Sequence, residues 1–513
     1  MLRIDRAEDL DAAAVLAVAQ GRQLSLEPDL LERIGARRGE VLHLLERGGP
    51  VYGVTTGLGA ASEVRLDGDA QSKHQNNLML ARAVGSAPWL NVADTRAVLA
   101  VRLRTFLGGD AGVSPALCLR LVELLNAGLH PAIPCTRIGA AGEIIPLAHL
   151  GGALTGSGDF LAGPVATTDP GMNPGRAPGT APAAEVLSAA GMTPYSFGPK
   201  EGIALIEGVP VTTALALLRM NEARLLADHA VALTAAELAL VGASRDPLAP
   251  ALARADGELG HVLGAIRRLS GPDPAPRALQ SPLSFRVLGP AIAQLLRSIG
   301  AVDAAVDRAL NGVTDSPAYL DGRFVGTAGF DGFDLAAALD GLRLSIIHVA
   351  ETSAARMHRL LDDGFTGLSR QLSGQPGLHA GTVAVHKRAV GVVHALVAGA
   401  RPSGIGAIET SLGQEDIQSF SVEAAESCAV AVSGLRDVLA CELLTVIQGI
   451  RLAGGMPAGP AAELTTLLAE ASNLLPAGTG DRPFGRDIAA LELLLASGWA
   501  RGMLSREPSI RGR

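Results

Sequence analysis

Three charged residues stand in apolar stretches of the chain, where a charge is costly unless it is paired or used. Glu207 ends the apolar run that Lys200-Glu-Gly opens, Arg286 stands alone in another, and Glu415 lies in Gln414-Glu-Asp ahead of a long apolar segment. Such groups can bind a charged substrate or transfer protons. They can equally form structural ion pairs or helix caps, and the residues alone leave both interpretations open.

Two short loops add candidates of a different kind. Tyr52-Gly-Val-Thr-Thr-Gly places a tyrosine between flexible residues, and Gly139-Ala-Ala-Gly-Glu is a turn of small residues before a helix expected near Pro146. A phenol can act as an acid or a base, but a base near neutral pH needs a depressed pKa. The alternative for Tyr52 is a loop tyrosine packed for stability.

The composition excludes several classes of protein. Hydrophobic residues make up 48% of the 513 residues, and aromatic residues only 3%, so we expect an aliphatic core. The net charge of −8 argues against nucleic acid as a partner. The histidines show no metal-binding spacing, and no metal site is predicted. The four cysteines lie far apart, the acidic start does not resemble a signal peptide, and no long charge-free stretch predicts a membrane span, so we expect a cytoplasmic protein.

The dominant periodicity is helical. Val211–Leu240 and Val422–Leu452 predict long core helices, Gly322–Gly329 a short hairpin, and the Pro- and Gly-rich run Gly163–Pro182 a loop. The predicted fold class is mainly α with a smaller mixed N-terminal part. We expect residues 1–200 to carry the Tyr52 loop and the small-residue turn, and residues 201–513 to form a central long-helix bundle and C-terminal helices.

Eight segments between Tyr52 and Phe420 resemble motifs of the aromatic amino-acid ammonia-lyases and aminomutases, in the family's order. They are VYGVTTGLG, HQNNLMLARAVG, IGAAGEIIPLAHL, KEGIALIEG, QSPLSFR, LNGVTDSP, GFDG and SLGQEDIQSF. The resemblance implies the ammonia-lyase fold, with a central bundle of long helices. It also implies a homotetramer that acts on a small-molecule substrate, with each active site shared between subunits.

The family's cofactor position departs from its pattern. In the family an Ala-Ser-Gly tripeptide cyclises and loses water to give 4-methylideneimidazol-5-one (MIO), an electrophile. Here the tripeptide is Ala140-Ala141-Gly142. Because an alanine methyl cannot leave as a hydroxyl does, MIO cannot form by this route, and we expect no cofactor.

The resemblance also assigns roles to other residues. Tyr52 matches the family's catalytic acid–base, Arg286 the arginine that grips the substrate carboxylate, and Glu415 a glutamate beside the substrate amine or side chain. Arg82 stands at a substrate-selectivity position, where it could face an anionic or polar substrate end. The remaining positions implied to line the substrate are Asn77, Asn311, Gln414, Phe330 and Leu283. For Asn77 and Gln414, hydrogen bonds within a helix or loop are the structural alternative.

Several substitutions accompany Ala141. Glu143, Glu207, Leu283, Asp331 and Arg82 all replace residues typical of the family, and one engineered change would not bring these along. We therefore predict a lyase-type enzyme that works without MIO on a small amino acid or related carboxylate. Elimination, addition, isomerisation and cyclisation are the expected reaction classes, with a place in specialised metabolism.

In this hypothesis Tyr52, Glu207 and Glu415 are the catalytic residues, and Glu207 binds a cation or acts as a base near the missing electrophile. Glu207 could instead pair with Arg82 or Arg286 in a dead cavity. Two other interpretations stay open. One is an ammonia-lyase inactivated by an engineered serine-to-alanine change, and the other is a non-catalytic binding or scaffold protein.

Overall fold

The computed structural model describes residues 1–139, 141–162, 179–273, 279–406 and 408–504. The protein is mainly α-helical, which confirms the predicted fold class. The chain forms two compact units. Unit 1 comprises Met1–Leu218, Val302–Asp340 and Pro402–Glu426, and unit 2 comprises Arg219–Ala301, Gly341–Arg401 and Ser427–Arg513.

The elements of the first half are as follows: β1 (Leu2–Ile4), α1 (Ala12–Ala19), β2 (Leu24–Leu26), α2 (Pro28–Glu46), α3 (Gly68–Ala81), α4 (Val92–Leu107), α5 (Pro115–Ala127), α6 (Ile144–Thr155), β3 (Asp159–Leu161), β4 (Thr180–Pro182), α7 (Ala183–Ala189), α8 (Glu201–Ile206) and α9 (Pro210–Leu240). The strand pairs are short: β1 pairs with β2 in parallel, and β3 pairs with β4 antiparallel.

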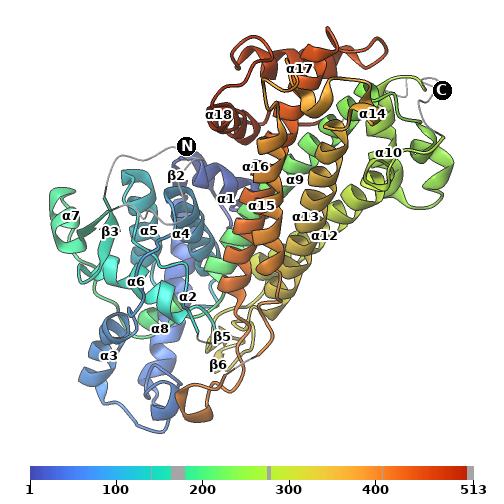
Figure 1. Ribbon diagram of the computed structural model, residues 1–513. Helices are drawn as coiled ribbons and strands as arrows, with labels where there is room; N and C mark the ends of the chain where they lie inside the picture. The colour runs from blue at the N-terminus through green and yellow to red at the C-terminus, as the bar shows by residue number, and fades with distance from the viewer. Residues whose placement is uncertain (140, 163–178, 274–278, 407, 505–513) are drawn as a thin grey trace. The chain divides into compact units, whose positions relative to one another are not determined.

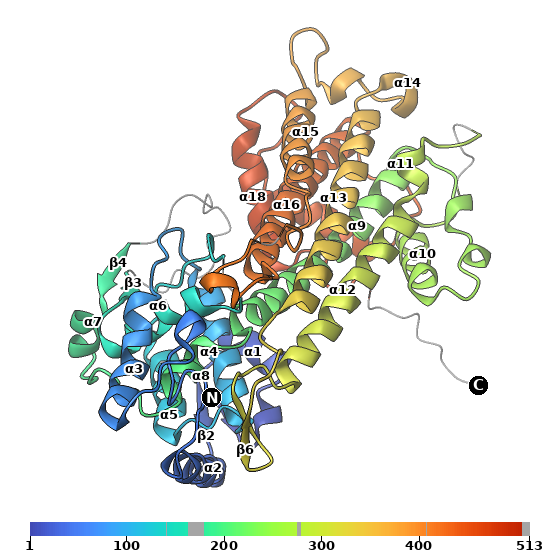
Figure 2. The ribbon, with the colours of Figure 1, turned by 90° about the horizontal axis from the view of Figure 1, so that it is seen from below.

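The elements of the second half are α10 (Gly257–Ser270), α11 (Leu283–Arg286), α12 (Leu288–Asn311), β5 (Ala318–Leu320), β6 (Arg323–Val325), α13 (Phe333–Leu360), α14 (Asp363–Thr366), α15 (Val383–Ala398), α16 (Ser421–Leu452), α17 (Ala462–Asn473) and α18 (Phe484–Ser497). Within unit 2, segments of α9, α12, α13, α15 and α16 run side by side as a bundle (Figure 1 and Figure 2).

Both long core helices predicted from the sequence are present. Each begins one residue earlier than predicted, as α9 at Pro210 and α16 at Ser421. The stretch Glu201–Leu240 has the length and hydropathy of a membrane span, but 89% of its most apolar window is buried inside the protein. A helix that is apolar on every side and covered by protein is a core helix.

The predicted hairpin lies slightly earlier in the chain, over Ala318–Val325. Asp321 and Gly322 form its tip with φ of +48° and +77°, because the two-residue turn that suits twisted strands needs positive φ at both positions. Gly322 is therefore the tip of the hairpin and not its first residue. Most of the predicted Gly163–Pro182 loop lies outside the described residues.

Close packing in unit 1 fixes the elements that carry the candidate site. Helices α3, α6 and α8 pack against one another. At Gly151 of α6, a Cβ atom would lie 2.0 Å from the sulfur of Met79 on α3 and 2.9 Å from Leu205 Cδ2 on α8. Only glycine allows these helices to approach so closely.

Candidate active site

The loop that carries Tyr52 is held against α8 by one buried amide. Gln75 of α3, fully buried, donates from Nε2 to the Gly53 carbonyl at 2.9 Å and accepts at Oε1 from the Ile203 N–H at 3.0 Å. Helix α8 ends at Ile206, and Glu207 is its C-cap residue. Gln75 therefore fixes the Tyr52 loop to the element that ends in Glu207. Gln75 was not predicted as a site residue, although it is a polar residue in the HQNNLMLARAVG motif.

A second loop brings Glu415 to the same place. The Ser411 side chain faces Gly59, where a Cβ atom would lie 3.6 Å from Ser411 Cβ. The Gly59 N–H in turn donates to the Tyr52 hydroxyl at 2.9 Å. Within the loop, Thr410 Oγ1 donates to Glu415 Oε2 at 2.8 Å, and the buried Gln418 donates to the Glu415 carbonyl at 3.1 Å. Gln418 is a second positioning residue that the sequence did not reveal.

The Tyr52 hydroxyl holds its proton at neutral pH. Partial burial raises its pKa above the ordinary value of 10.0, and the charges of Glu207 and Glu415 raise it further. The Gly59 N–H and the Arg82 cation act in the opposite direction without reversing the shift. The depressed pKa that a base would need is not provided by these surroundings, so Tyr52 is suited to donate a proton.

Glu207 is a buried carboxyl group whose pKa is raised into the range of reversible proton transfer near neutral pH. The residue is 6% exposed, and its carboxyl makes no hydrogen bond or ion pair among the residues that the structure describes. Burial raises its pKa to about 8, and the negative charges of Asp315 and Glu415 add to the effect, while the Lys200 and Arg102 cations oppose it. A carboxyl group with this pKa can accept and return a proton near neutral pH.

Two buried cations lie close to Glu207, and both are engaged elsewhere. Lys200 Nζ donates to Asp315 Oδ2 at 2.6 Å, with both residues buried. Arg102 donates to the main-chain carbonyls of Ala204 (3.1 Å) and Glu207, at the end of α8. Neither cation neutralises the Glu207 carboxyl by direct contact, and this explains why its pKa stays high.

Glu143, another substitution noted in the sequence, has a structural role. Its carboxylate accepts from the main-chain N–H groups of Val211 (2.5 Å) and Thr212 (2.6 Å), the first turn of α9. A carboxylate satisfies these free N–H groups and complements the helix dipole. Burial nevertheless raises its pKa to about 7.

The small-residue turn lies beside this cluster. Gly142 has φ of +72°, and a Cβ atom there would lie 3.6 Å from the Phe330 carbonyl oxygen and 3.9 Å from that of Gly208. Gly208 follows Glu207 directly, so the turn and Glu207 are neighbours. Ala141 offers only a methyl group, and the residues present do not fit MIO formation by dehydration. Ala140 lies outside the described residues.

Arg82 faces the cluster from the end of α3. Burial lowers its pKa, and Tyr52, Glu207 and Glu415 each raise it, so all three groups lie within its electrostatic reach. Among the described residues, Arg82 and Glu207 form no ion pair. The structure thus brings together Tyr52, Arg82, Glu207 and Glu415, and places Phe330 beside the turn.

The other predicted positions divide into three groups. Asn77 and Gln414 are exposed, and neither side chain has a hydrogen-bond partner in the described part of the chain. Asn311 is not part of the cluster; Arg104 donates to its Oδ1 and it donates to Asp307, both at 2.8 Å. Arg286 and Leu283 lie on α11 in unit 2, where Arg286 donates to Gln280 at 3.2 Å. Among the described residues, no group of three His, Cys, Asp or Glu side chains could hold a metal ion.

The raised pKa of Glu207 predicts a specific dependence of stability on pH. The proton on the folded carboxyl stabilises the protein fully below the ordinary pKa of 4.5, and this stability is lost as the pH rises through about 8. Relative to Glu207→Gln, which does not titrate, the wild type is expected to lose free energy of unfolding over this range. Urea unfolding of both proteins at several pH values measures the difference between their free energies of unfolding. The titration of groups that the two proteins share cancels in this difference. A buried carboxyl of this kind titrates between about pH 5 and 8. If the difference in free energy of unfolding stays constant over this range, the raised pKa of Glu207 is contradicted.

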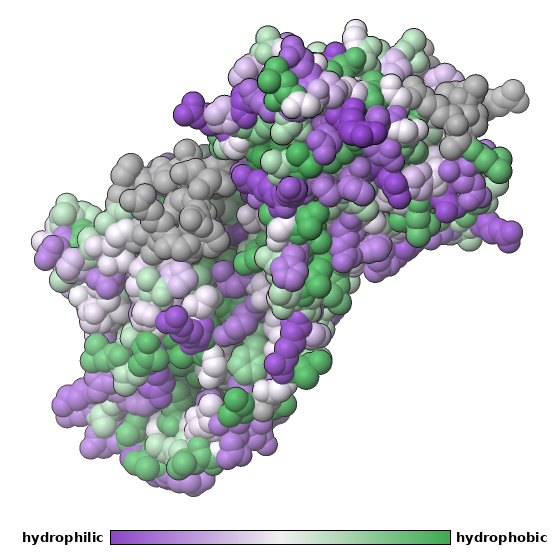
Figure 3. Space-filling view, viewed as in Figure 1, coloured by the Kyte–Doolittle hydropathy of each residue, from purple (hydrophilic) through white to green (hydrophobic). Residues whose placement is uncertain are grey.

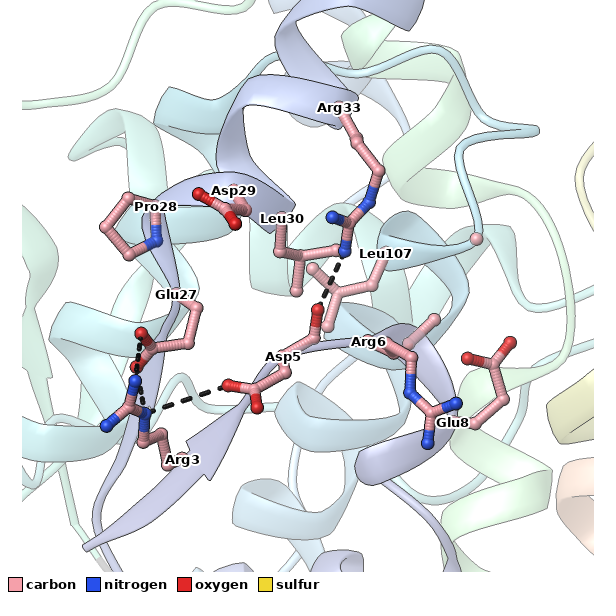
Figure 4. A pocket seen from close by; sticks show the side chains of 12 residues that line it. Arg3, Asp5, Arg6, Glu8, Glu27, Pro28, Asp29, Leu30, Arg33 and Leu107 are labelled. Atoms are coloured by element: carbon pink, nitrogen blue, oxygen red, sulfur yellow. Dashed lines mark hydrogen bonds and ion pairs between the residues drawn. The ribbon is translucent and has the colours of Figure 1, made fainter.

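A surface pocket elsewhere in unit 1 has a different character. It has a volume of about 630 Å³ and lies between β1, the start of α2 and the end of α4 (Figure 4). Two of its arginines already have partners: Arg3 pairs with Glu27 at 2.6 Å, and Arg33 donates to the Asp5 main-chain carbonyl at 2.7 Å. The Tyr52 cluster, with its unpaired carboxyl, is the better candidate for chemistry.

Known proteins resemble this chain over nearly its whole length. The family described as aromatic amino acid lyase matches residues 10–472. Histidine ammonia-lyase of Anaeromyxobacter dehalogenans (strain 2CP-C) is 32% identical over 509 residues, which cover 96% of this chain and 98% of that protein. The corresponding enzyme of Geobacillus thermodenitrificans (strain NG80-2) is 30% identical over 512 residues, with the same coverage.

Solved structures share the fold. Tyrosine aminomutase from Streptomyces globisporus superposes with a TM-score of 0.88 at 24% identity, covering 99% of this chain and 100% of that one. Histidine ammonia-lyase from Trypanosoma cruzi gives a TM-score of 0.85 at 24% identity, covering 96% and 93%. At these identities the structures establish the architecture alone.

Proposed function

Because the chain belongs to the aromatic amino acid lyase family, we propose that it is a lyase-type enzyme that works without MIO on a small amino acid or related carboxylate. The observation that carries this proposal is the cluster of Tyr52, Glu207 and Glu415 beside a turn that has alanine at 141. A scaffold protein would have no need to bury an unpaired carboxyl next to a tyrosine hydroxyl.

The cluster supports acid–base chemistry with divided roles. Glu207, with a pKa of about 8, takes a proton from the substrate as the base. Tyr52 keeps its proton at neutral pH and supplies one to the leaving or forming group. The charge of Glu415 acts on both groups and raises the pKa of each. Each of the expected reactions, which are elimination, addition, isomerisation and cyclisation at the carbon β to the carboxylate, needs one proton acceptor and one proton donor.

We further propose a homotetramer with active sites shared between subunits. Family members are commonly oligomeric. Unit 1 exposes large apolar side chains near the site, among them Leu80, Val84, Leu412 and Ile417, and apolar groups are visible on the surface around α3 (Figure 3). Exposed apolar groups of this kind typically mark an interface. In this arrangement Arg286 of another subunit would grip the substrate carboxylate through its planar fork.

The proposal also includes a cytoplasmic location and a place in specialised metabolism. All four cysteines are free and buried in the described structure, as in a reducing compartment. The substituted site residues support a substrate other than the family's usual aromatic amino acids.

Mass spectrometry provides the direct test. The full-length protein is incubated with pools of amino acids and related carboxylates, and loss or formation of each compound is followed. We expect at least one compound to be converted by the wild type. The proposal fails if no compound is converted.

Restoring serine at position 141 separates a rebuilt site from a merely inactivated one. We expect Ala141→Ser to release no ammonia from histidine, phenylalanine or tyrosine, because Glu207, Arg82 and Leu283 remain in place of the family's usual residues. Near-ultraviolet absorbance reports MIO formation, and an ammonia assay reports turnover. Ammonia release by the variant would instead support an ammonia-lyase inactivated by a single change.

A further inference from the structure

We propose that Glu207 and Glu415 together bind a planar cationic group of the substrate, a guanidinium or amidinium. This inference rests on the proposed function, because it assigns a substrate class to the same site. It goes beyond that function in naming the charge and shape of the group that enters.

The Glu207 carboxyl needs a partner. It is more than nine-tenths buried, and none of the described residues hydrogen-bonds to it or forms an ion pair with it. An ionised carboxylate in such a place is costly unless a proton or a cation joins it. The free protein solves this with a proton, and a cationic substrate group would take the proton's place.

The protein's own cations do not fill this role. Lys200 is bound to Asp315, and Arg102 is bound to two main-chain carbonyls. Arg82 lies within electrostatic reach of both glutamates, but the described structure contains no ion pair between Arg82 and either of them. Among the described residues, no cation therefore forms an ion pair with Glu207, although the charges of Glu207 and Glu415 both act on Tyr52.

Two carboxylates from different elements favour a planar cation over a compact one. Glu207 comes from the end of α8 and Glu415 from the loop after η6 (Ser411–Gly413), and the charge of Glu415 acts on Glu207. A guanidinium has donors along several edges and can bond to two carboxylates at once, whereas an ammonium is a point charge.

Binding of this kind releases a proton. Six charged or titratable groups act on Glu207 or respond to it: Asp315, Lys200, Arg102, Glu415, Tyr52 and Arg82. The incoming cation displaces the proton from Glu207. Affinity for a cation is therefore expected to rise as the pH rises toward about 8 and then to level off.

L-Arginine and L-citrulline form the matched probe pair, since a neutral urea replaces the guanidinium and the rest of the molecule is the same. Isothermal titration calorimetry on the full-length assembly, at pH 8, measures both affinities. We expect arginine to bind at least about tenfold more tightly than citrulline. Glu207→Gln is expected to abolish this preference, and Glu409→Gln, an exposed change just before the same loop, is expected to keep it.

Equal affinities in the wild type, or a preference that survives Glu207→Gln, would overturn the inference. Because binding is measured without turnover, the two proposals fail separately. A preference for arginine that depends on Glu207, with no compound converted, supports the cation site and contradicts the enzyme function. If an uncharged compound is converted but arginine is not preferred over citrulline, the enzyme function is supported and the cation site is contradicted.

Discussion

Replacement of Tyr52 by phenylalanine is expected to lower turnover by about 10²- to 10⁴-fold, the usual contribution of a positioned acid–base group. The phenol is the proton donor of the proposed reaction, held by the Gly59 N–H at 2.9 Å and within the electrostatic reach of Glu207 and Glu415. Since phenylalanine keeps the ring and removes only the hydroxyl, substrate binding should change far less than kcat. Steady-state kinetics on the substrate found by mass spectrometry measures both.

Tyr319→Phe is the matched control. This substitution also removes a hydrogen-bonded hydroxyl, which lies 3.2 Å from Glu40. Tyr319 lies on strand β5 and is not part of the Tyr52 cluster. The turnover of the Tyr319→Phe variant should equal that of the wild type. Full activity of Tyr52→Phe would exclude Tyr52 as the proton donor.

The chain offers a substrate-free check on the same residue. It has only three tyrosines, and in a Tyr195→Phe/Tyr319→Phe background Tyr52 is the only one left. Burial and the two glutamates raise its pKa, so tyrosinate absorbance should appear at higher pH than for a free phenol. A titration at or below the ordinary value of 10.0 would mean that the site favours the phenolate.

The largest effect on stability is expected from Arg356→Met in unit 2. Arg356 of α13 lies between Glu237 of α9 and Glu442 of α16, and all three side chains are fully buried. Burial raises the pKa of Glu237 well above its ordinary value, and Glu442 adds to the shift. Loss of the arginine leaves two buried carboxyl groups without a cation, which is expected to cost about 3–5 kcal/mol in the free energy of unfolding.

Urea denaturation followed by circular dichroism measures this loss. Arg359→Met, three residues further along α13, removes an exposed arginine whose nearest carboxylate lies 3.7 Å away, and should cost less than about 1 kcal/mol. Replacing the whole group, with Arg356→Met, Glu237→Leu and Glu442→Leu together, should recover most of the stability because no buried charge is left. Equal midpoints for Arg356→Met and Arg359→Met would contradict the prediction.

Several features of this protein follow from the sequence alone. The long helices α9 and α16 were predictable because their apolar residues persist over many turns without proline. Ordered motifs such as VYGVTTGLG and SLGQEDIQSF identify the family without any structure. The obstacle to MIO at Ala141 is equally a property of the residue, because a methyl group cannot leave as water in any fold.

Local sequence was less informative for the polar residues. Asn311 matches a site-lining position, yet Arg104 and Asp307 bind both ends of its amide. Gln75 and Gln418 carry no catalytic signal in the sequence, yet each is buried and positions a loop of the site. The partners Arg104 of Asn311 and Ile203 of Gln75 come from segments far apart in the chain, and residue spacing cannot reveal them.

The chemistry of the site also depends on groups that are distant in the sequence. In the sequence, Tyr52 and Glu207 are groups with ordinary pKa values of 10.0 and 4.5. Only the tertiary structure places Asp315 and Glu415 near the buried Glu207 while it engages Lys200 and Arg102 elsewhere. Burial and distant charges set the pKa of a group, so the upward shift at Tyr52 and the pKa of about 8 at Glu207 were decided by folding.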